Sequence, residues 1–166
     1  MADGNKIPDH IEWMGKLVVN LQSLEFALRA FLHNCETGWA NQGGPSFLDN
    51  LTEGQQLEEN AFTDYDQLKD LVRKYNHEVE SKNTDLKVDP GVVRIRDALA
   101  HGRIAGLSPS LNEPLRLVKY DKPTKGRVHV TDYHILTKEW FDEKIKWVYQ
   151  SIKNVRDADK LFRSQP

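Results

Sequence analysis

Apolar residues recur every three or four positions over residues 8–35, which is the pattern of a helix with one buried face. The members of this stripe are Met14, Leu17, Val18, Leu21, Leu24, Leu28, Phe31, Leu32 and Cys35. Pro8 suits a first helical turn, and Asp9 and Glu12 place negative charge at the positive end of the helix dipole. The spacing predicts a helix of about 40 Å, which needs partners along its length.

Residues 36–62 contain several glycines and many polar side chains, so we expect a long connection with a short helical turn around 47–51. Such a connection either covers a functional or partner surface or is a surface excursion without a role, and both interpretations stay open. A second helix should follow, capped by Thr63 or Asp64. Its predicted buried face is Leu68, Leu71, Val72, Tyr75 and Val79.

The clearest start and stop signals enclose residues 90–101. Asp89 is a capping residue, and Pro90 fits the first helical position. Gly102 fits the left-handed residue that often follows a helix. We therefore predict a third helix of about twelve residues. Its apolar face is Val92, Ile95 and Leu99.

Two short β-prone runs come next, at 115–120 and 127–133, with turn residues 121–126 between them. They predict a β-hairpin insertion over 114–134, which must pack on the helices or on another subunit because an isolated hairpin is marginally stable. A last amphipathic helix is expected from Thr137 to about Arg163. Its apolar positions are Phe141, Ile145, Val148, Ile152, Val155 and Phe162.

These elements predict a mainly α protein, an up-down bundle of about four helices with the hairpin between the third and fourth. The length of 166 residues fits a single domain over 1–166. The apolar runs are too short to span a bilayer, and the polar N-terminal residues do not resemble a signal peptide. Cys35 is the only cysteine, which suits a reducing compartment, so we expect a cytoplasmic protein with Cys35 buried rather than nucleophilic.

The charge is unevenly distributed, although the net charge is only −2. Residues 1–83 carry 7 basic and 14 acidic side chains, whereas residues 84–166 carry 16 basic and 11 acidic ones. Neutralisation within one fold is the favoured interpretation, and attraction of a polyanion is the alternative. The last helix raises the same choice between a solvated face and a nucleic-acid surface. Its basic residues are Lys144, Lys146, Lys153, Arg156, Lys160 and Arg163.

The residues with the most chemistry gather at the end of the predicted third helix. Arg94, Arg96, Asp97, His101 and Arg103 fall within ten positions. A guanidinium stays charged at neutral pH while an imidazole exchanges protons there, and together they suffice for phosphate chemistry without a metal. Asp97 and His101 are four residues apart and share a helix face, so the carboxylate can orient the imidazole.

Arg96 and His101 are five residues apart, about 140° around the helix axis, so one helix brings them together poorly. Two copies of the helix meeting across a two-fold axis would gather both pairs in one cleft. Ala98 and Ala100 are small enough to permit that approach. The structural alternative is a capped, salt-bridged helix end.

The segment Arg96-Asp-Ala-Leu-Ala-His101 resembles the Arg-x4-His motif of the HEPN superfamily, in which a polar residue follows the arginine. A small helical bundle with the motif on its third main helix is similar as well. The resemblance implies a metal-independent endoribonuclease acting as a homodimer in stress or phage defence. Attack by a ribose 2′-hydroxyl would give a 2′,3′-cyclic phosphate, with His101 handling protons, Arg96 stabilising charge on the phosphate and Asp97 orienting both.

The chain departs from one HEPN toxin subgroup, which has a tyrosine where this sequence has Arg103. This departure argues against that subgroup and its antitoxin pairing, so a protein partner stays unspecified. An aspartate, Asp97, stands where asparagine is frequent.

Arg94 and Arg103 are predicted as further substrate contacts. The expected partners are a second copy of the chain and RNA or a nucleotide, without a membrane. We expect no cofactor and no metal, because no other histidine has the spacing of a metal ligand. The alternative function is a non-catalytic HEPN-like module that binds a protein or nucleotide partner.

Overall fold

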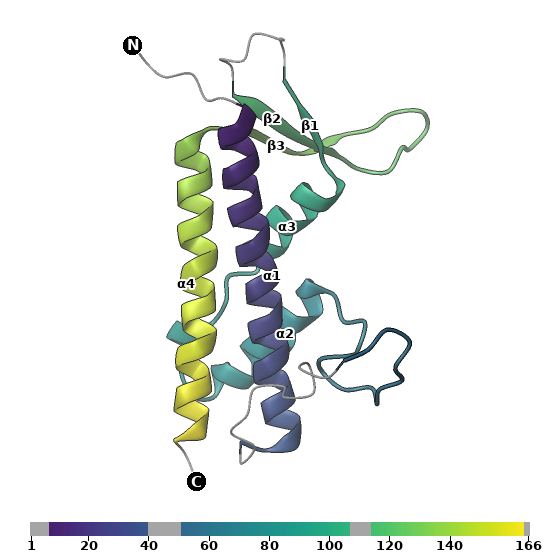
Figure 1. The fold of residues 1–166 in the computed structure, drawn as a ribbon. Coiled ribbons are helices and arrows are strands. Elements are labelled where there is room, and N and C mark those ends of the chain that lie inside the picture. The colour runs from purple at the N-terminus through teal and green to yellow at the C-terminus, as the bar shows by residue number, and fades with distance from the viewer. Residues whose placement is uncertain (1–6, 40–50, 107–113, 165–166) are drawn as a thin grey trace. The chain divides into compact units, whose positions relative to one another are not determined.

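The computed structural model describes residues 7–39, 51–106 and 114–164 (Figure 1). Within these ranges the protein is mainly helical. The helices are α1 (Ile7–Thr37), α2 (Leu68–Glu80), the short 3₁₀ helix η2 (Thr84–Leu86), α3 (Gly91–His101) and α4 (Lys138–Arg163). The strands are β1 (Arg103–Ala105), β2 (Leu115–Tyr120) and β3 (Val130–Leu136). The mainly helical class is therefore confirmed, with a small antiparallel sheet of three strands between α3 and α4.

The chain divides into two compact units. The first is formed by Met1–Leu21 and Gly91–Tyr149, and the second by Gln22–Pro90 and Gln150–Pro166. Helices α1 and α4 each contribute residues to both units. Each unit has its own buried apolar side chains.

The first unit packs α3 and parts of α1 and α4 with the small sheet. Its buried apolar side chains are Leu17, Leu21, Val92, Ile95, Ala98, Leu117, Leu136, Phe141 and Val148. On α3 the third buried position is Ala98, and the expected Leu99 is only partly covered. The buried His10 ring lies against Trp13 and Phe141, and its Nε2 is 2.9 Å from the carbonyl oxygen of Leu136. This hydrogen bond joins α1 to the end of β3.

The strands form an antiparallel sheet in the order β1-β2-β3. Lys125 and Gly126 both have positive φ, 52° and 74°, which makes the tip a two-residue turn of the kind that matches strand twist. The second β-prone run, predicted to start at 127, forms β3, which begins only at Val130. His129 donates its backbone N–H to the Asp121 side chain there, and the pairing of β2 with β3 is irregular after Lys119. Strand β1 was not predicted, since its three exposed residues carry no alternation.

Gly102 joins α3 to β1 at a very close approach. Its N–H donates to the carbonyl oxygen of Ala98 over 2.8 Å. A Cβ at this position would lie 2.3 Å from that oxygen and 2.6 Å from Cδ1 of Leu117. The described glycines with positive φ are Gly38, Gly54 and Gly126, so the predicted left-handed conformation of Gly102 is wrong. The position requires glycine because it has no room for a side chain.

The second unit is formed by α2, η2, the segment before α2 and parts of α1 and α4. Its buried apolar side chains include Leu24, Leu28, Phe31, Leu32, Ala61, Leu68, Leu71, Val72, Tyr75, Val79, Val88, Ile152, Val155 and Ala158. Burial, with neighbouring carboxylates, raises the pKa of Cys35 to about 12. Cys35 is only half-buried, so its predicted burial holds in part, and the raised pKa keeps the thiol protonated at neutral pH.

Helix α2 begins at Leu68, and its N-cap Gln67 makes no side-chain cap, so the predicted caps are wrong. Thr63 and Asp64 instead take part in a turn ahead of the helix, where Asp64 accepts from the backbone N–H of Asp66. Most of the turn expected at 47–51 lies outside the described residues. Residues 51–67, by contrast, are described and contain no helix or strand.

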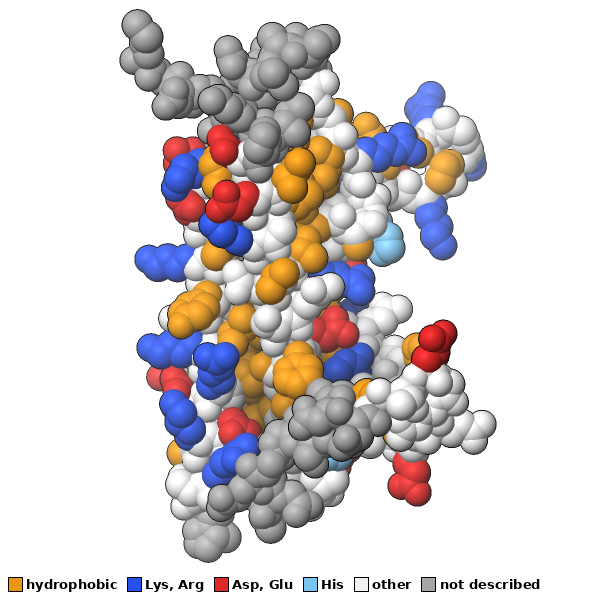
Figure 2. Space-filling view, viewed as in Figure 1, with side chains coloured by type: hydrophobic (Ala, Val, Ile, Leu, Met, Phe, Trp, Pro, Cys, Tyr) orange, Lys and Arg blue, Asp and Glu red, His pale blue; other side chains and the backbone are white. Residues whose placement is uncertain are grey.

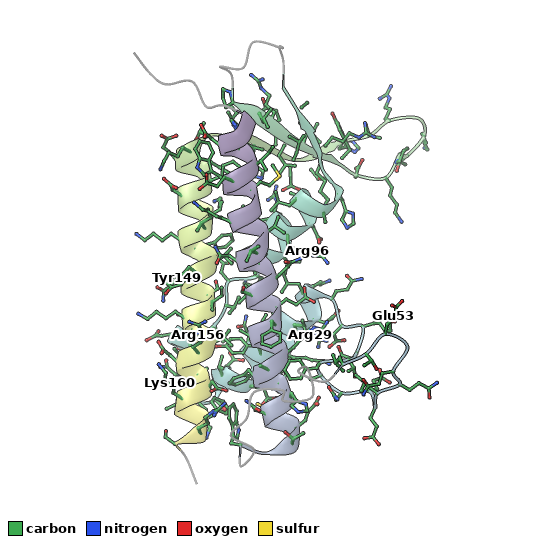
Figure 3. The ribbon with its side chains drawn as sticks, viewed as in Figure 1. Arg29, Glu53, Arg96, Tyr149, Arg156 and Lys160 are labelled. Carbon is green, nitrogen blue, oxygen red and sulfur yellow. The ribbon has the colours of Figure 1, made fainter. Side chains whose placement is uncertain are left out.

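Arg29 fastens this turn to α1 (Figure 3). One terminal nitrogen donates to the carbonyl oxygen of Ala61 over 2.9 Å and to Oδ1 of Asp64 over 2.7 Å. The other donates to the carbonyl oxygen of Asp66 over 2.7 Å. A longer contact of 3.4 Å joins Arg29 to Glu25 of the same helix. Arg29 is thus a largely buried anchor and not a surface ion pair.

Gly102→Ala should lower the free energy of unfolding by about 1–3 kcal/mol, because the new Cβ forces the end of α3 away from β2. Gly15→Ala is the matched control, since nothing lies within 4 Å of a Cβ built there. It should be neutral or stabilising by about 0.5–1 kcal/mol. Urea unfolding followed by circular dichroism measures both. Equal stability of the two variants would contradict this account of Gly102.

Arg29→Met should cost about 1–3 kcal/mol at pH 7, because it removes the nearer cation of the Asp64 carboxylate and leaves only Lys74, 4.0 Å away. Burial acts to raise the pKa of Asp64, but bonds from Arg29 and the Asp66 N–H outweigh it and lower the pKa below 3.8. The wild-type advantage is therefore complete above that value and shrinks as pH falls through the lowered pKa. Urea titrations at pH 7 and at about pH 3 test this. The exposed Arg73→Met should change little at either pH.

Candidate functional site

Arg96, labelled in Figure 3, forms an ion pair with Asp97, its neighbour on α3. A terminal nitrogen of Arg96 lies 3.2 Å from Oδ1 of Asp97, and both side chains are about two-fifths exposed, at 41% and 38%. The carboxylate predicted to orient His101 is therefore directed to its neighbouring arginine instead. The pair is open to solvent, where a phosphate oxygen can compete with Asp97 for the guanidinium.

His101 is the last residue of α3 and is exposed. Its ring makes no hydrogen bond or ion pair with any residue that the structure describes, so the expected contact with Asp97 is not formed. The close turn at Gly102 follows immediately and holds the helix end against β2. The imidazole is thus an accessible group on a fixed backbone.

Arg94 is held by β3. Its Nε donates to Oδ1 of Asp132 and a terminal nitrogen donates to the carbonyl oxygen of Thr131 over 2.8 Å. The Asp132 side chain is only 3% exposed, so this carboxylate depends on Arg94 for charge compensation. These bonds give Arg94 a role in the fold, and its predicted contact with a substrate remains a prediction.

Asp132 and His134 were not recognised in the sequence. They are two residues apart on β3 and so share a face of the strand, which is the signal that could have linked them. Nε2 of His134 lies 4.0 Å from Oδ1 of Asp132. Burial lowers the pKa of His134, and the cations Lys144 and Arg94 act in the same direction against Asp132. His134 is therefore a neutral ring in the packing, beside Trp140.

Ala98 is fully buried in the first unit. The proposal that it lets two copies of α3 approach closely is therefore wrong, since a side chain in the core cannot line a surface between subunits. Ala100, on another side of the helix, is exposed and keeps that possibility.

Arg103 lies on β1 rather than on the helix. Its guanidinium carbon is 5.4 Å from the centroid of the Tyr120 ring on β2, a cation–π distance. The predicted site residues therefore fall on two elements, with Arg94, Arg96, Asp97 and His101 on α3 and Arg103 on β1.

The basic residues of α4 are partly neutralised by acids of the same helix. Lys160 pairs with Asp157 over 3.2 Å, and Arg163 pairs with Asp159 over 2.7 Å. Lys144 likewise lies 2.7 Å from Glu143. Figure 3 marks Arg156 and Lys160 on this helix. The pairing favours a solvated face over a nucleic-acid surface.

Among the described residues, no group of three or more histidine, cysteine or acidic side chains could hold a metal ion. No helix in the described ranges is both long and apolar enough to cross a membrane. Comparison of the chain with protein-family models, with curated proteins and with solved structures finds no match.

Arg94 and Arg96 provide a matched test of which arginine belongs to the fold. Arg94→Ala should lower the free energy of unfolding by about 1–3 kcal/mol, because it leaves the buried Asp132 carboxylate without its arginine partner. Solvent exposure of Arg94 keeps this loss below that of a fully buried ion pair. Arg96→Ala should change it by less than about 1 kcal/mol, because its ion pair is solvent-exposed. Chemical unfolding of both variants measures the two free energies of unfolding. A larger loss of stability for Arg96→Ala than for Arg94→Ala would show that Arg96 belongs to the fold.

Proposed function

We propose that this protein is a metal-independent endoribonuclease of the HEPN type, built as an up-down helical bundle and active as a homodimer. The observation that carries the proposal is the accessibility of Arg96, in the middle of α3, and of His101, at its end. Arg94 on the same helix is engaged by a buried carboxylate, whereas these two side chains are not. Groups that are neither packed nor needed for the fold are the ones available for chemistry.

The reaction consistent with these groups is transesterification of RNA. The ribose 2′-oxygen attacks the adjacent phosphorus, the bond to the 5′-oxygen breaks, and a 2′,3′-cyclic phosphate forms. His101 removes the proton from the 2′-hydroxyl, and the partner's His101 protonates the departing 5′-oxygen. Arg96 exchanges its bond to Asp97 for the phosphate, whose charge it stabilises in the transition state. Before that exchange, Asp97 orients the guanidinium.

A second copy supplies the imidazole that one chain lacks. Within the first unit, Ile11 and Val19 of α1 are 67% and 59% exposed. Nothing lies within 4 Å of a Cβ built on Gly15, between them. Figure 2 shows hydrophobic side chains along this helix. Exposed apolar surface of this kind supports self-association.

The non-catalytic alternative has one observation in its favour, which is that His101 and Asp97 do not meet in one chain. In that case the exposed helix end serves a protein or nucleotide partner and turns nothing over. The two functions differ in what loss of His101 does to RNA.

Purified protein should cleave unstructured RNA in EDTA, leaving 2′,3′-cyclic phosphate ends that mass spectrometry identifies. His101→Ala and Arg96→Ala should each lower the rate at least about 100-fold while remaining folded. His77→Ala is the matched control, since His77 is an exposed histidine in the last turn of α2. Cys35→Ala should be active as well.

An RNA with a single 2′-deoxy nucleotide at the cleaved position should resist cleavage there, because the nucleophile is missing. The rate per protein should fall on dilution as dimers dissociate. Cleavage that survives in His101→Ala, or no cleavage of any RNA at any protein concentration, would refute the nuclease and leave the binding module.

A further inference from the structure

The sheet of the first unit has an exposed face of mixed aromatic and basic character. Residues paired directly across antiparallel strands share a face. The register therefore gives two rows, Arg103–Val118–Tyr133 and Ala105–Arg116–Ile135, with Tyr120 next to them on β2. The opposite face is the packed one, since it carries the buried Leu117, Asp132 and Leu136.

Two tyrosine rings on this face are open to solvent. Tyr133 is 53% exposed and Tyr120 is 40% exposed, and Ile135 beside them is 44% exposed. Tyr120 is two residues beyond the partner of Tyr133, a diagonal separation of roughly 7 Å between backbones. Exposed apolar side chains gathered in this way mark an interaction surface rather than a scatter of single residues.

Each ring is held by an arginine. Nε of Arg116 donates to the Tyr133 hydroxyl over 3.1 Å. Arg103 lies over the Tyr120 ring at 5.4 Å. We call Arg103, Arg116, Tyr120 and Tyr133 the tyrosine–arginine face. Rings fixed before a ligand arrives lose little freedom on binding.

The charged side chains described on this face are basic. The described strand residues on this face include no acidic side chain. Asp132 is buried on the other side. The hairpin tip adds the exposed Lys122, Lys125 and Arg127, and the acid Asp121 is held there by His129 at 2.7 and 2.9 Å. Figure 1 shows this tip extending beyond the helices of the unit, and Figure 2 shows its Lys and Arg side chains.

We propose that the tyrosine–arginine face binds a single strand of RNA, with bases stacked on Tyr120 and Tyr133 and phosphates along Arg103, Arg116 and the hairpin tip. Stacking platforms within a positive groove are how proteins bind unpaired nucleic acid, because every base presents a π-face. The choice of RNA over DNA rests on the proposed function, whereas the single strand rests on the exposed rings. A second copy of the chain is disfavoured because like charges would face each other.

Binding is tested by fluorescence anisotropy with labelled 12-nucleotide RNA of mixed sequence, in EDTA, using His101→Ala protein so that no cleavage interferes. Tyr133→Ala and Tyr120→Ala should each weaken binding at least about fivefold. Tyr133→Phe should bind within about twofold of the parent, because the stacking ring remains. Tyr149→Ala is the matched control, since Tyr149 is an equally exposed tyrosine, 58%, on α4. It should leave the affinity unchanged.

The salt dependence of binding, and a comparison of single-stranded with duplex RNA, distinguish this proposal from general attraction of a polyanion. Arg103→Ala should reduce the slope of log K against log salt by about 0.7, whereas Arg103→Lys should preserve it. Duplex RNA bound as tightly as the single strand would overturn the proposal, because paired bases cannot stack on tyrosine. Tighter binding of single-stranded DNA than of RNA would overturn the choice of RNA.

Four further results are decisive. Absence of RNA binding up to about 100 µM protein would overturn the proposal, because even non-specific binding is normally detected in that range. Dimers that dissociate on Tyr133→Arg, with RNA affinity intact, would identify a contact between copies instead. If wild-type protein binds RNA through the tyrosines but cleaves none, only the proposed nuclease activity is refuted. If cleavage is unchanged in both tyrosine variants, only the proposed RNA-binding role of the tyrosine–arginine face is refuted.

Discussion

The lack of space at Gly102 is the constraint on which the first unit depends. With the helix carbonyl of Ala98 and the Leu117 side chain so near, the chain can leave α3 and enter β1 only through a residue without a Cβ. That turn lets β1 pair with β2, with Arg103 opposite Val118, and it leaves His101 exposed at the helix end. A different exit would move Arg103 away from Tyr120 and rotate the last turn of α3. The packing of one glycine therefore sets the positions of both the candidate catalytic end and the tyrosine–arginine face.

The arginines of this protein divide according to the carboxylates around them. Arg29 and Arg94 meet carboxylates withdrawn from water, Asp64 and Asp132, and each ties together segments that are distant in the sequence. Arg96 meets only the half-exposed Asp97, and Arg103 meets an aromatic ring. A guanidinium with a buried partner cannot leave it without a large cost, whereas a guanidinium with an exposed partner can exchange it for a phosphate at little cost. Accessibility of the partner, and not the arginine itself, thus separates the groups available for a ligand from those that maintain the fold.

Periodicity predicted the long helices α1 and α4 well, because they bury one face over many turns, and the short α3 was found from the start and stop signals at its ends. Periodicity failed where the local structure depends on contacts of a few residues. The caps expected at Thr63 and Asp64 form a turn held by Arg29, a residue more than thirty positions away that no local pattern reveals. Strand β1 is too short and too exposed to alternate. The candidate residues on α3 were found from the motif, but the direction of each side chain was not, since Asp97 can reach either His101 or Arg96. Asp132 and His134 were missed because only the packed face of a sheet shows why they lie together.

The two surfaces of the first unit are separated by one residue, because His101 ends α3 and Arg103 begins β1. A strand of RNA bound along the tyrosine–arginine face, as proposed, would therefore contact Arg103 two residues from His101, the candidate acid–base group, with Gly102 fixing the path between them. Most of the binding free energy would then come from stacking and from the hairpin cations rather than from the few groups at the helix end. Such a division suits a site with a single guanidinium and a single imidazole per chain, because binding by remote parts of a substrate can hold the reacting bond in place.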